Sequence, residues 1–262
     1  MTAILSVENV SLRFGGITAL ADVDLEVKHG DLHALIGPNG AGKTSLFNVI
    51  SGIYPPTHGE VIFEGQRITR MKPHATVSLG IARTFQNIEL FRNMTVIDNL
   101  LLGRHQLMRA DPFSAALFLG RALREEIAHR TRVEEIIDFL EIERYRKQPV
   151  GVLPYGIQKR VELGRALATD PKLLLLDEPA AGMNVEETED IARFIIDIKE
   201  ELGIAILMVE HDMGVVMDIA DRVSVLDFGI KIADGTPNEV QSNPRVIQAY
   251  LGEEEQMSWA AT

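Results

Sequence analysis

A glycine-rich segment has the residue types and spacing of a loop that binds phosphate. Its residues are, in order, Gly37, Pro38, Asn39, Gly40, Ala41, Gly42, Lys43 and Thr44. They fit the pattern G-x-x-x-x-G-K-[ST], in which glycines let backbone N–H groups face the phosphates and the positive end of a following helix points at them. Lys43 would place its charge at the β- and γ-phosphates, and the Thr44 hydroxyl would coordinate Mg²⁺. A chance match is expected in about 1% of chains this long, so we predict a nucleotide site.

Two carboxylates, Asp177 and Glu178, follow the apolar run 173–176. In enzymes with such a phosphate loop, a strand of this kind lies beside the loop, so that its carboxyl end faces the same crevice. Asp177 is then placed to hold Mg²⁺, usually through water. Glu178 can accept a proton from an attacking water. A strand that ends in a solvated acidic turn is commoner for the pair alone, but the upstream phosphate loop favours the catalytic interpretation.

His211 follows a third apolar run, at 205–209. A single histidine is more often a surface or structural residue, and six others in the chain have no assigned role. At the end of a parallel strand, however, His211 would point toward the same crevice as Glu178. We expect it to hydrogen-bond the γ-phosphate and to position water, and not to ligate a metal.

The elements that must position these residues alternate between strand and helix patterns. Buried strands are predicted at 33–36, 173–176, 205–209 and 222–226, and helices at 44–51 and 186–201. This alternation predicts a mainly parallel sheet with crossover helices. Residues 1–30 and 59–68 alternate with period two between glycine and proline breaks, which predicts antiparallel hairpins. From about 95 to 147 the pattern is helical, with a break at Asp111-Pro112, and it predicts an inserted helical subdomain.

Composition excludes several classes of protein. The 262 residues are 46% hydrophobic and 24% charged, which is ordinary for a folded chain. The absence of cysteine excludes disulfides and thiolate metal sites. The apolar stretch 112–119 is too short for the roughly 18–20 residues that cross a bilayer, and residues 1–9 do not have the pattern of a secretory signal. A formal net charge of -12 argues against a general nucleic-acid binder.

The order of these features resembles the ABC transporter ATPase family over essentially the whole chain. That order is the phosphate loop, Gln86, a glycine-containing loop at 153–158, Asp177-Glu178 and His211. The chain looks closest to the ATP-binding subunits of branched-chain amino acid importers. The stretches that carry this likeness are 12–20, 82–86, 178–182, 233–237, Asn243-Pro244 and 249–252.

The resemblance implies an α/β fold with a P-loop NTPase core, a mainly parallel sheet, an antiparallel β subdomain and an inserted helical subdomain. We expect a single domain over 1–262. The RecA-like core and the antiparallel subdomain would occupy 1–94 and 168–252, and the helical subdomain about 95–167. Residues 253–262 would form a frayed tail.

The resemblance also assigns roles that the residues alone do not. Phe14 would stack on the adenine of ATP, which contributes about 1–3 kcal/mol per base in nucleic-acid systems; a phenylalanine in the core of a strand is an equal alternative. Gln86 would touch the metal or the lytic water and sense the γ-phosphate at the junction with the helical subdomain. ATP and Mg²⁺ are therefore the expected ligands.

The loop at 153–158 departs from the family's Leu-Ser-Gly-Gly-Gln signature. It reads Leu-Pro-Tyr-Gly-Ile-Gln, and Pro154 lacks both the hydroxyl and the backbone N–H of serine. Gly156 can still bring its N–H close to a phosphate, before a helix that we expect at 157–168. In the family, two ATPase subunits meet head to tail and each phosphate loop faces the other's signature, so Pro154 should weaken the partner's site. Asn184 stands where many relatives have Asp, and the sequence does not say what this alters.

The implied function is ATP hydrolysis that drives import of branched-chain or related amino acids at the cytoplasmic face of the cell membrane. The implied partners are integral membrane permease subunits, a second ATPase subunit in a homodimer or heterodimer, and indirectly a substrate-binding protein, with no nucleic acid. A groove near 87–99, with Leu90 and Phe91 exposed, would receive a helix of the permease. Alternatives are urea or lipopolysaccharide transport, or a regulatory module that does not hydrolyse ATP. ABC ATPases of DNA repair or translation are less favoured, because they tend to carry coiled-coil insertions or tandem domains.

Overall fold

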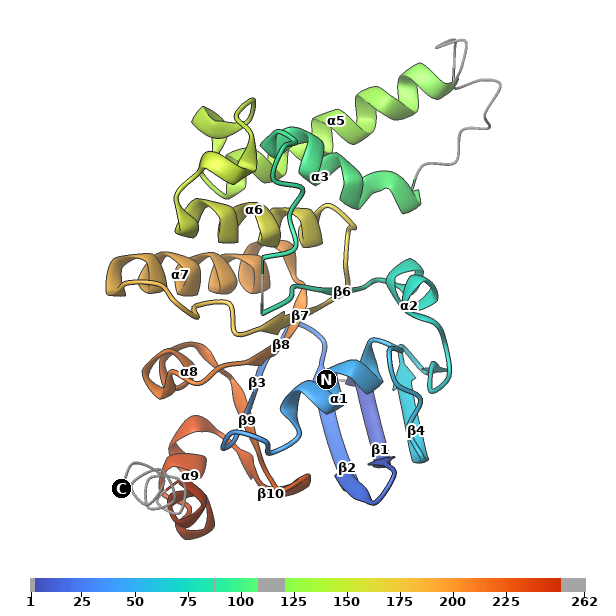
Figure 1. The fold of residues 1–262 in the computed structure, drawn as a ribbon, viewed down its shortest axis with the longest axis vertical. Coiled ribbons are helices and arrows are strands. Elements are labelled where there is room, and N and C mark those ends of the chain that lie inside the picture. The colour runs from blue at the N-terminus through green and yellow to red at the C-terminus, as the bar shows by residue number, and fades with distance from the viewer. Residues whose placement is uncertain (1–2, 87, 108–120, 251–262) are drawn as a thin grey trace.

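The computed structural model describes residues 3–86, 88–107 and 121–250, arranged around two sheets (Figure 1). The larger sheet has the strand order β10-β9-β3-β8-β7-β6. All neighbouring pairs are parallel except β9 and β10. The strands are β3 (Leu32–Ile36), β6 (Ile81–Arg83), β7 (Leu173–Asp177), β8 (Ala205–Val209), β9 (Arg222–Asp227) and β10 (Ile230–Gly235). The mainly parallel sheet predicted from the sequence is confirmed.

The central strands are buried on both faces, because alternate residues enter two separate cores. On β7, Leu174 and Leu176 pack into one core with α7 (Val185–Leu202). Leu173 and Leu175 pack into the other core, with α1 (Lys43–Ile50) and the smaller sheet. The continuous apolar run read from the sequence therefore reflects a strand that lies between two layers.

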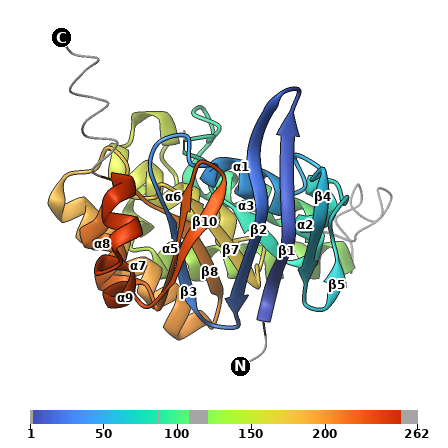
Figure 2. The same cartoon turned by 90° about the horizontal axis from the view of Figure 1, so that it is seen from below.

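The smaller sheet is antiparallel, with the order β2-β1-β4-β5. Its strands are β1 (Ala3–Phe14), β2 (Ile17–Lys28), β4 (His58–Phe63) and β5 (Gln66–Arg67). The strands β1 and β2 form a long hairpin (Figure 2) that turns at Gly15, which has a φ of 58°. These are the antiparallel hairpins that the period-two pattern predicts.

Helices from the middle of the chain stack over α7 on the side away from the small sheet (Figure 1). They are α3 (Val96–Arg104), η1 (His105–Leu107), α5 (Arg121–Phe139), η2 (Glu143–Tyr145), η3 (Val150–Val152) and α6 (Tyr155–Leu167). Their apolar faces join the same core as α7. The remaining helices are α2 (Pro73–Leu79), α8 (Met213–Ile219) and α9 (Pro237–Gln241). Within the described ranges, no helix combines the length and the apolar character of a membrane span.

The structure differs from the sequence predictions at Leu90 and at the start of the helix expected at 157–168, and it shows the role of Asn184. Leu90 was expected to be exposed and is not: it is 8% exposed and packs in the core, whereas Phe91 is 57% exposed. The helix expected at 157–168 begins two residues earlier, at Tyr155, with Pro154 as its N-cap. Asn184 caps α7, because its side chain accepts the N–H of Glu187 and its own N–H is bound by the Glu187 carboxylate. Asn87, the break at Asp111-Pro112, the run 112–119 and the tail from 253 lie outside the described residues.

Candidate functional site

The glycine-rich loop 37–42 connects the end of β3 to the start of α1. Gly37 has a φ of 145°, and a Cβ there would lie 2.0 Å from the carbonyl oxygen of Leu226 on β9. Gly42 has a φ of 104°, and a Cβ would lie 2.7 Å from the carbonyl oxygen of Ala19 on β2. Any side chain at these two positions would push the loop away from both sheets, so the loop requires glycine for close approach as well as for its backbone angles.

Lys43 holds its ammonium inside this loop. The side chain is 6% exposed, and Nζ donates to the carbonyl oxygens of Gly37 at 2.6 Å and Pro38 at 3.0 Å. Asn39 and Gly40 are exposed at the tip of the loop, and Ala41 is buried. Thr44 is exposed in the first turn of α1. The predicted phosphate-binding residues therefore form one loop, with the cation at its centre and a helix N-terminus behind it.

The two carboxylates lie at the end of β7, as predicted, but β7 is not the immediate neighbour of β3. Strand β8 lies between them, and the carboxyl ends of all three strands share one edge of the sheet. Asp177 is 4% exposed, and its Oδ2 accepts a hydrogen bond of 2.7 Å from Nη2 of Arg83. The carboxylates and the loop that follows β3 therefore lie at the same edge of the sheet, with β8 between the two strands.

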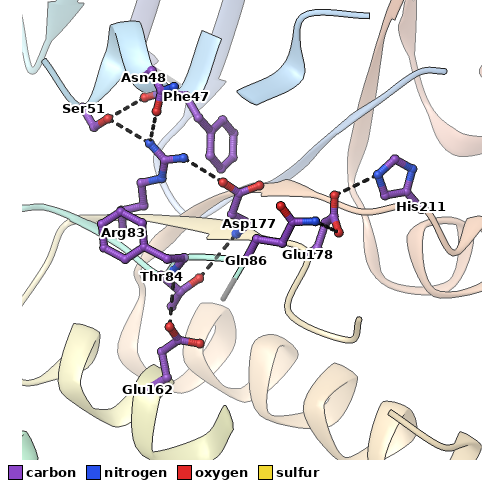
Figure 3. Close-up of polar contacts among 11 residues, drawn as sticks. Phe47, Asn48, Ser51, Arg83, Thr84, Gln86, Glu162, Asp177, Glu178 and His211 are labelled. Atoms are coloured by element: carbon purple, nitrogen blue, oxygen red, sulfur yellow. Dashed lines mark hydrogen bonds and ion pairs between the residues drawn. The ribbon is translucent and has the colours of Figure 1, made fainter. Parts of the chain in front are cut away.

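Gln86, Glu178 and His211 meet in one hydrogen-bonded group (Figure 3). Nε2 of Gln86 donates to Oε2 of Glu178 at 2.9 Å, and Nε2 of His211 lies 2.9 Å from Oε1. The Glu178 side chain is 16% exposed, whereas that of His211 is 43% exposed. Glu178 also adopts a left-handed backbone conformation, with a φ of 51°. The three residues assigned to catalysis from the sequence thus come together at one carboxylate.

Glu210 is a functional candidate that the sequence reading missed. It is 4% exposed and accepts backbone N–H groups from Ala180 at 2.8 Å and from His211 at 3.0 Å. Burial raises the pKa of Glu210, and the nearby charge of Glu178 raises it further. The carboxyl group therefore fixes the segment after Glu178 to the segment that carries His211. One feature of the sequence could have indicated this role: Glu210 is a charged residue that directly follows the apolar strand 205–209.

Arg83, at the end of β6, was also missed. Besides Asp177, its guanidinium binds Oδ1 of Asn48 on α1 at 2.7 Å and Oγ of Ser51, the C-cap of α1, at 3.2 Å. The rings of Phe47 and Phe85 lie 5.5 and 5.3 Å from it. Nothing local in the sequence marks Arg83, because its hydrogen-bond partners lie more than 30 residues away in each direction.

Phe14 lies at the end of β1 and is 45% exposed. Its ring meets that of Tyr54 edge to face, with the centroids 5.2 Å apart. The alternative of a phenylalanine in the core of a strand is therefore excluded. Tyr54, which no sequence pattern singled out, adds a second exposed aromatic ring to this surface.

The loop at 153–158 is held against α7 and the segment that follows Glu178. Tyr155 Oη donates to the carbonyl oxygen of Ala181 at 2.9 Å. Gly156 is buried, and a Cβ there would lie 2.6 Å from Oε1 of Glu187. The Glu187 carboxylate of the same chain therefore lies directly against Gly156.

A buried ion pair on α6 reaches the main chain of Gln86. Lys159 Nζ lies 3.4 Å from Glu162 and donates to the carbonyl oxygen of Gln86 at 3.2 Å. Glu162 accepts the N–H of Phe85 at 3.5 Å, and burial raises its pKa. The helical region is therefore joined directly to the backbone on either side of the Phe85–Gln86 peptide.

The oxygen donors at this edge fit Mg²⁺. They are the Thr44 hydroxyl, the Asp177 carboxylate and the Gln86 amide, all ligands that hard cations prefer. In the part of the chain that the structure describes, no group of three His, Cys, Asp or Glu side chains could form a metal site. A magnesium ion in a nucleotide site needs only one or two protein ligands, because phosphates and water supply the rest.

Two family models match this chain. Residues 20–181 match the ABC transporter model, and residues 231–256 match the model of the branched-chain amino acid ATP-binding cassette transporter. The high-affinity branched-chain amino acid transport ATP-binding protein BraF of Pseudomonas aeruginosa is 41% identical over 95% of this chain and 98% of its own length. The corresponding protein LivG of Escherichia coli (strain K12) is 39% identical with the same coverage.

Solved structures agree with these matches. An ATP-binding cassette of an ABC transporter in its ADP conformation superposes with a TM-score of 0.84 at 35% identity, covering 97% of this chain and 100% of its own. A dimeric ATP-binding cassette bound to ADP and Pi superposes with a TM-score of 0.74 at 26% identity, covering 89% of this chain and 98% of its own. The predicted fold class is confirmed.

Proposed function

The chain belongs to the ABC transporter family of ATP-binding proteins, and from this premise we propose that it hydrolyses ATP to drive the import of branched-chain amino acids. The observation that carries the hydrolytic step is the hydrogen-bonded group of Gln86, Glu178 and His211. A binding module without turnover has no need of a carboxylate oriented from both sides. Similarity to branched-chain amino acid transport proteins across 95% of the chain supports the substrate class.

In the proposed reaction, the loop 37–42 and Lys43 bind the phosphates, while Phe14 and Tyr54 offer ring surfaces to the adenine. Mg²⁺ held by Thr44, Asp177 and Gln86 would neutralise charge on the phosphates. Glu178 accepts a proton from the attacking water, and His211 and Gln86 keep the carboxylate in one orientation. Through its N–H bond to Glu210, the backbone of His211 is also held in place.

The proposed partners follow from the family. Permease subunits in the cell membrane would bind the cytoplasmic ATPase at the surface around the exposed Phe91. Movement at Gln86 would reach the helical region through Lys159, which binds the Gln86 carbonyl. A substrate-binding protein would act through the permease.

A second ATPase subunit, identical or different, would complete the nucleotide site. A related cassette is dimeric with ADP and Pi, which supports such pairing. The loop at 153–158 would then face the partner's nucleotide, as in the family's head-to-tail arrangement. For Gly156 to reach a phosphate there, the Glu187 carboxylate that covers it would have to move. Pro154, which offers neither hydroxyl nor N–H, supports the hypothesis of a weaker site on the partner's side.

The proposal is tested by phosphate release from the purified protein with ATP and Mg²⁺, alone and with its partner subunits. Glu178→Gln should lower the hydrolysis rate about 10²–10⁴-fold, because the general base is lost while the shape is kept. Affinity for ATP should stay within about twofold, since Glu178 does not belong to the phosphate loop. Glu186→Gln, an exposed carboxylate in the first turn of α7, is the matched control. Equal rates for the protein and its Glu178→Gln variant would remove the hydrolytic role and leave a nucleotide-gated regulator.

A further inference from the structure

We propose that Arg83 is a positioning residue for the magnesium site: its guanidinium orients Asp177 and braces that carboxylate against helix α1. The inference rests on the nucleotide site proposed above and assigns to that site a residue that holds no ligand itself. The contacts of Arg83 join three elements, β6, β7 and α1 (Figure 3).

The pair is buried, which distinguishes it from a surface ion pair. The side chain of Arg83 is 8% exposed and that of Asp177 is 5% exposed. Breaking such a pair leaves an uncompensated charge in the interior, so the two groups are held together strongly. Phe47 and Phe85 lie near the guanidinium as well, and these cation–π contacts limit its movement.

The same guanidinium connects the helix that carries one expected metal ligand, Thr44, to the strand that carries another, Asp177. Thr44 is in the first turn of α1, Asn48 follows it by four residues on that helix, and Ser51 follows it by seven as the helix C-cap. These positions fall along one side of an α-helix. Because Arg83 binds Asn48, Ser51 and Asp177 together, it fixes the spacing between the helix that carries Thr44 and the strand that carries Asp177.

The guanidinium also leaves one carboxylate oxygen of Asp177 that could hold a metal. It binds Oδ2 of Asp177, so Oδ1 is the oxygen we assign to the magnesium shell. The backbone N–H of Asp177 is held as well, by Oγ1 of Thr84 at 3.3 Å. A ligand that is already oriented by outer contacts binds metal more tightly than a free one, and loss of such contacts commonly lowers metal affinity about 10–100-fold.

A purely structural role is the alternative, and the chain contains a matched example. Arg104 on α3 is 9% exposed in its side chain and pairs with Asp170. It also donates to Nδ1 of His129 at 3.0 Å and to the carbonyl oxygen of Ala168 at 3.1 Å. This arginine braces the helical region away from the predicted metal ligands, although its partner Asp170 is 43% exposed. It therefore separates the loss of a buried arginine and its contacts from the loss of metal positioning.

The test measures binding of a fluorescent ATP analogue in EDTA and in graded MgCl₂, with the denaturation midpoint of each variant recorded in parallel. We define the magnesium gain as the dissociation constant of the analogue in EDTA divided by its dissociation constant in MgCl₂. Arg83→Gln should reduce this gain about tenfold while changing affinity in EDTA by less than about twofold. Asn48→Ala keeps the ion pair but removes one brace, so it should reduce the gain about threefold. Arg104→Gln should lower the midpoint and leave the gain unchanged.

An unchanged magnesium gain in a folded Arg83→Gln variant would overturn the inference. If that variant does not fold, Asn48→Ala and Ser51→Ala decide, and unchanged gains in both would overturn it. If the unmodified protein shows ATP binding but no magnesium gain, Arg83 has no metal site to position and the inference fails alone. If the unmodified protein does not bind the analogue at all, the nucleotide site itself is wrong.

Discussion

Polar side chains lie at both ends of the six-stranded sheet, but their hydrogen-bond and ion-pair partners differ. At the carboxyl end, the Glu178 carboxylate is contacted by Gln86 and His211, and the side chain of His211 is still 43% exposed. In the amino-terminal half, His33 is 1% exposed and its Nε2 lies 2.9 Å from Oγ of Ser224. That hydroxyl donates to Asp234.

The carboxylate of the amino-terminal network is neutralised by two cations. Asp234 is paired with Lys231 and Arg222, and these cations with the Ser224 hydroxyl lower the pKa of its carboxyl group although burial acts against them. Burial lowers the pKa of His33 to about 4, which keeps the imidazole neutral. We infer that the network of His33, Ser224 and Asp234 contributes to stability, and the group around Glu178 to chemistry. Changes at one end should therefore alter nucleotide binding and hydrolysis, and changes at the other should alter unfolding.

The largest effect on ATP binding is expected at Lys43. Lys43→Ala removes a charge-assisted contact to the phosphates, and charged hydrogen bonds contribute about 1.5–3 kcal/mol, so ATP affinity should fall about 10–100-fold. Equilibrium binding of a fluorescent ATP analogue measures this. The exposed Lys72→Ala is the control and should bind as the unmodified protein does. Retained affinity in the Lys43 variant would contradict the assignment of the loop.

A smaller loss is expected at His211. His211→Ala leaves Glu178 as a base but removes one of the two groups that orient it, so phosphate release should slow about tenfold or more while ATP affinity is kept. His29→Ala is the matched control, because His29 is an exposed histidine in a turn. If His211→Ala lowers the free energy of unfolding without slowing phosphate release, His211 has a structural role. The contrast between the two ends of the sheet would then be wrong.

At the other end of the sheet, the expected effect is on stability and depends on pH. The unfolded chain protonates His33 near pH 6.5 and the folded chain only near pH 4, so the unfolded state binds more protons between these values. Stability should therefore fall as pH drops from about 6.5 to about 4, by up to about 3 kcal/mol from this residue. Denaturant unfolding of the unmodified protein and His33→Gln across this range measures the difference. If the free energy of unfolding changes equally with pH in the two proteins, His33 does not contribute to this pH dependence.

The smallest effect is expected at Pro154. Serine is a good N-cap and should stabilise α6 by about 1 kcal/mol, but it also gives the unfolded chain freedom worth about 0.4–1 kcal/mol. The net change in the free energy of unfolding should be within about 1 kcal/mol, and hydrolysis by the site with Lys43 and Glu178 should change less than about twofold. In an assembled pair of ATPase subunits, Pro154→Ser should instead raise hydrolysis at the partner's site. No change there would count against the proposed effect of the altered signature.

Much of the site follows from local sequence. The glycines and Lys43 are contiguous, and apolar runs that end in polar residues predicted that Glu178 and His211 would share one edge of a parallel sheet. These predictions needed only the order of elements and the rule that parallel strands present their carboxyl ends together. The antiparallel hairpins followed in the same way from period-two alternation and glycine turns.

The residues that were missed depend on pairing between distant segments. Arg83 meets Asp177 because β6 pairs with β7, and a three-residue strand carries too little pattern to reveal that pairing. Glu210 accepts N–H groups from two loops, a role that depends on loop geometry. Leu90 was expected to be exposed because the groove was taken from the family's general form, whereas its burial is set by packing in the core of the helical region.

The left-handed backbone of Glu178 has a consequence for substitution at this position. A non-glycine residue in this conformation costs about 1–2 kcal/mol, which glycine would avoid. Glu64, Glu141 and Phe228 share this conformation, so it does not by itself mark a catalytic residue. At Glu178, however, glycine would also remove the carboxylate that Gln86 and His211 contact, so stability and the proposed hydrolysis favour different residues at this one position.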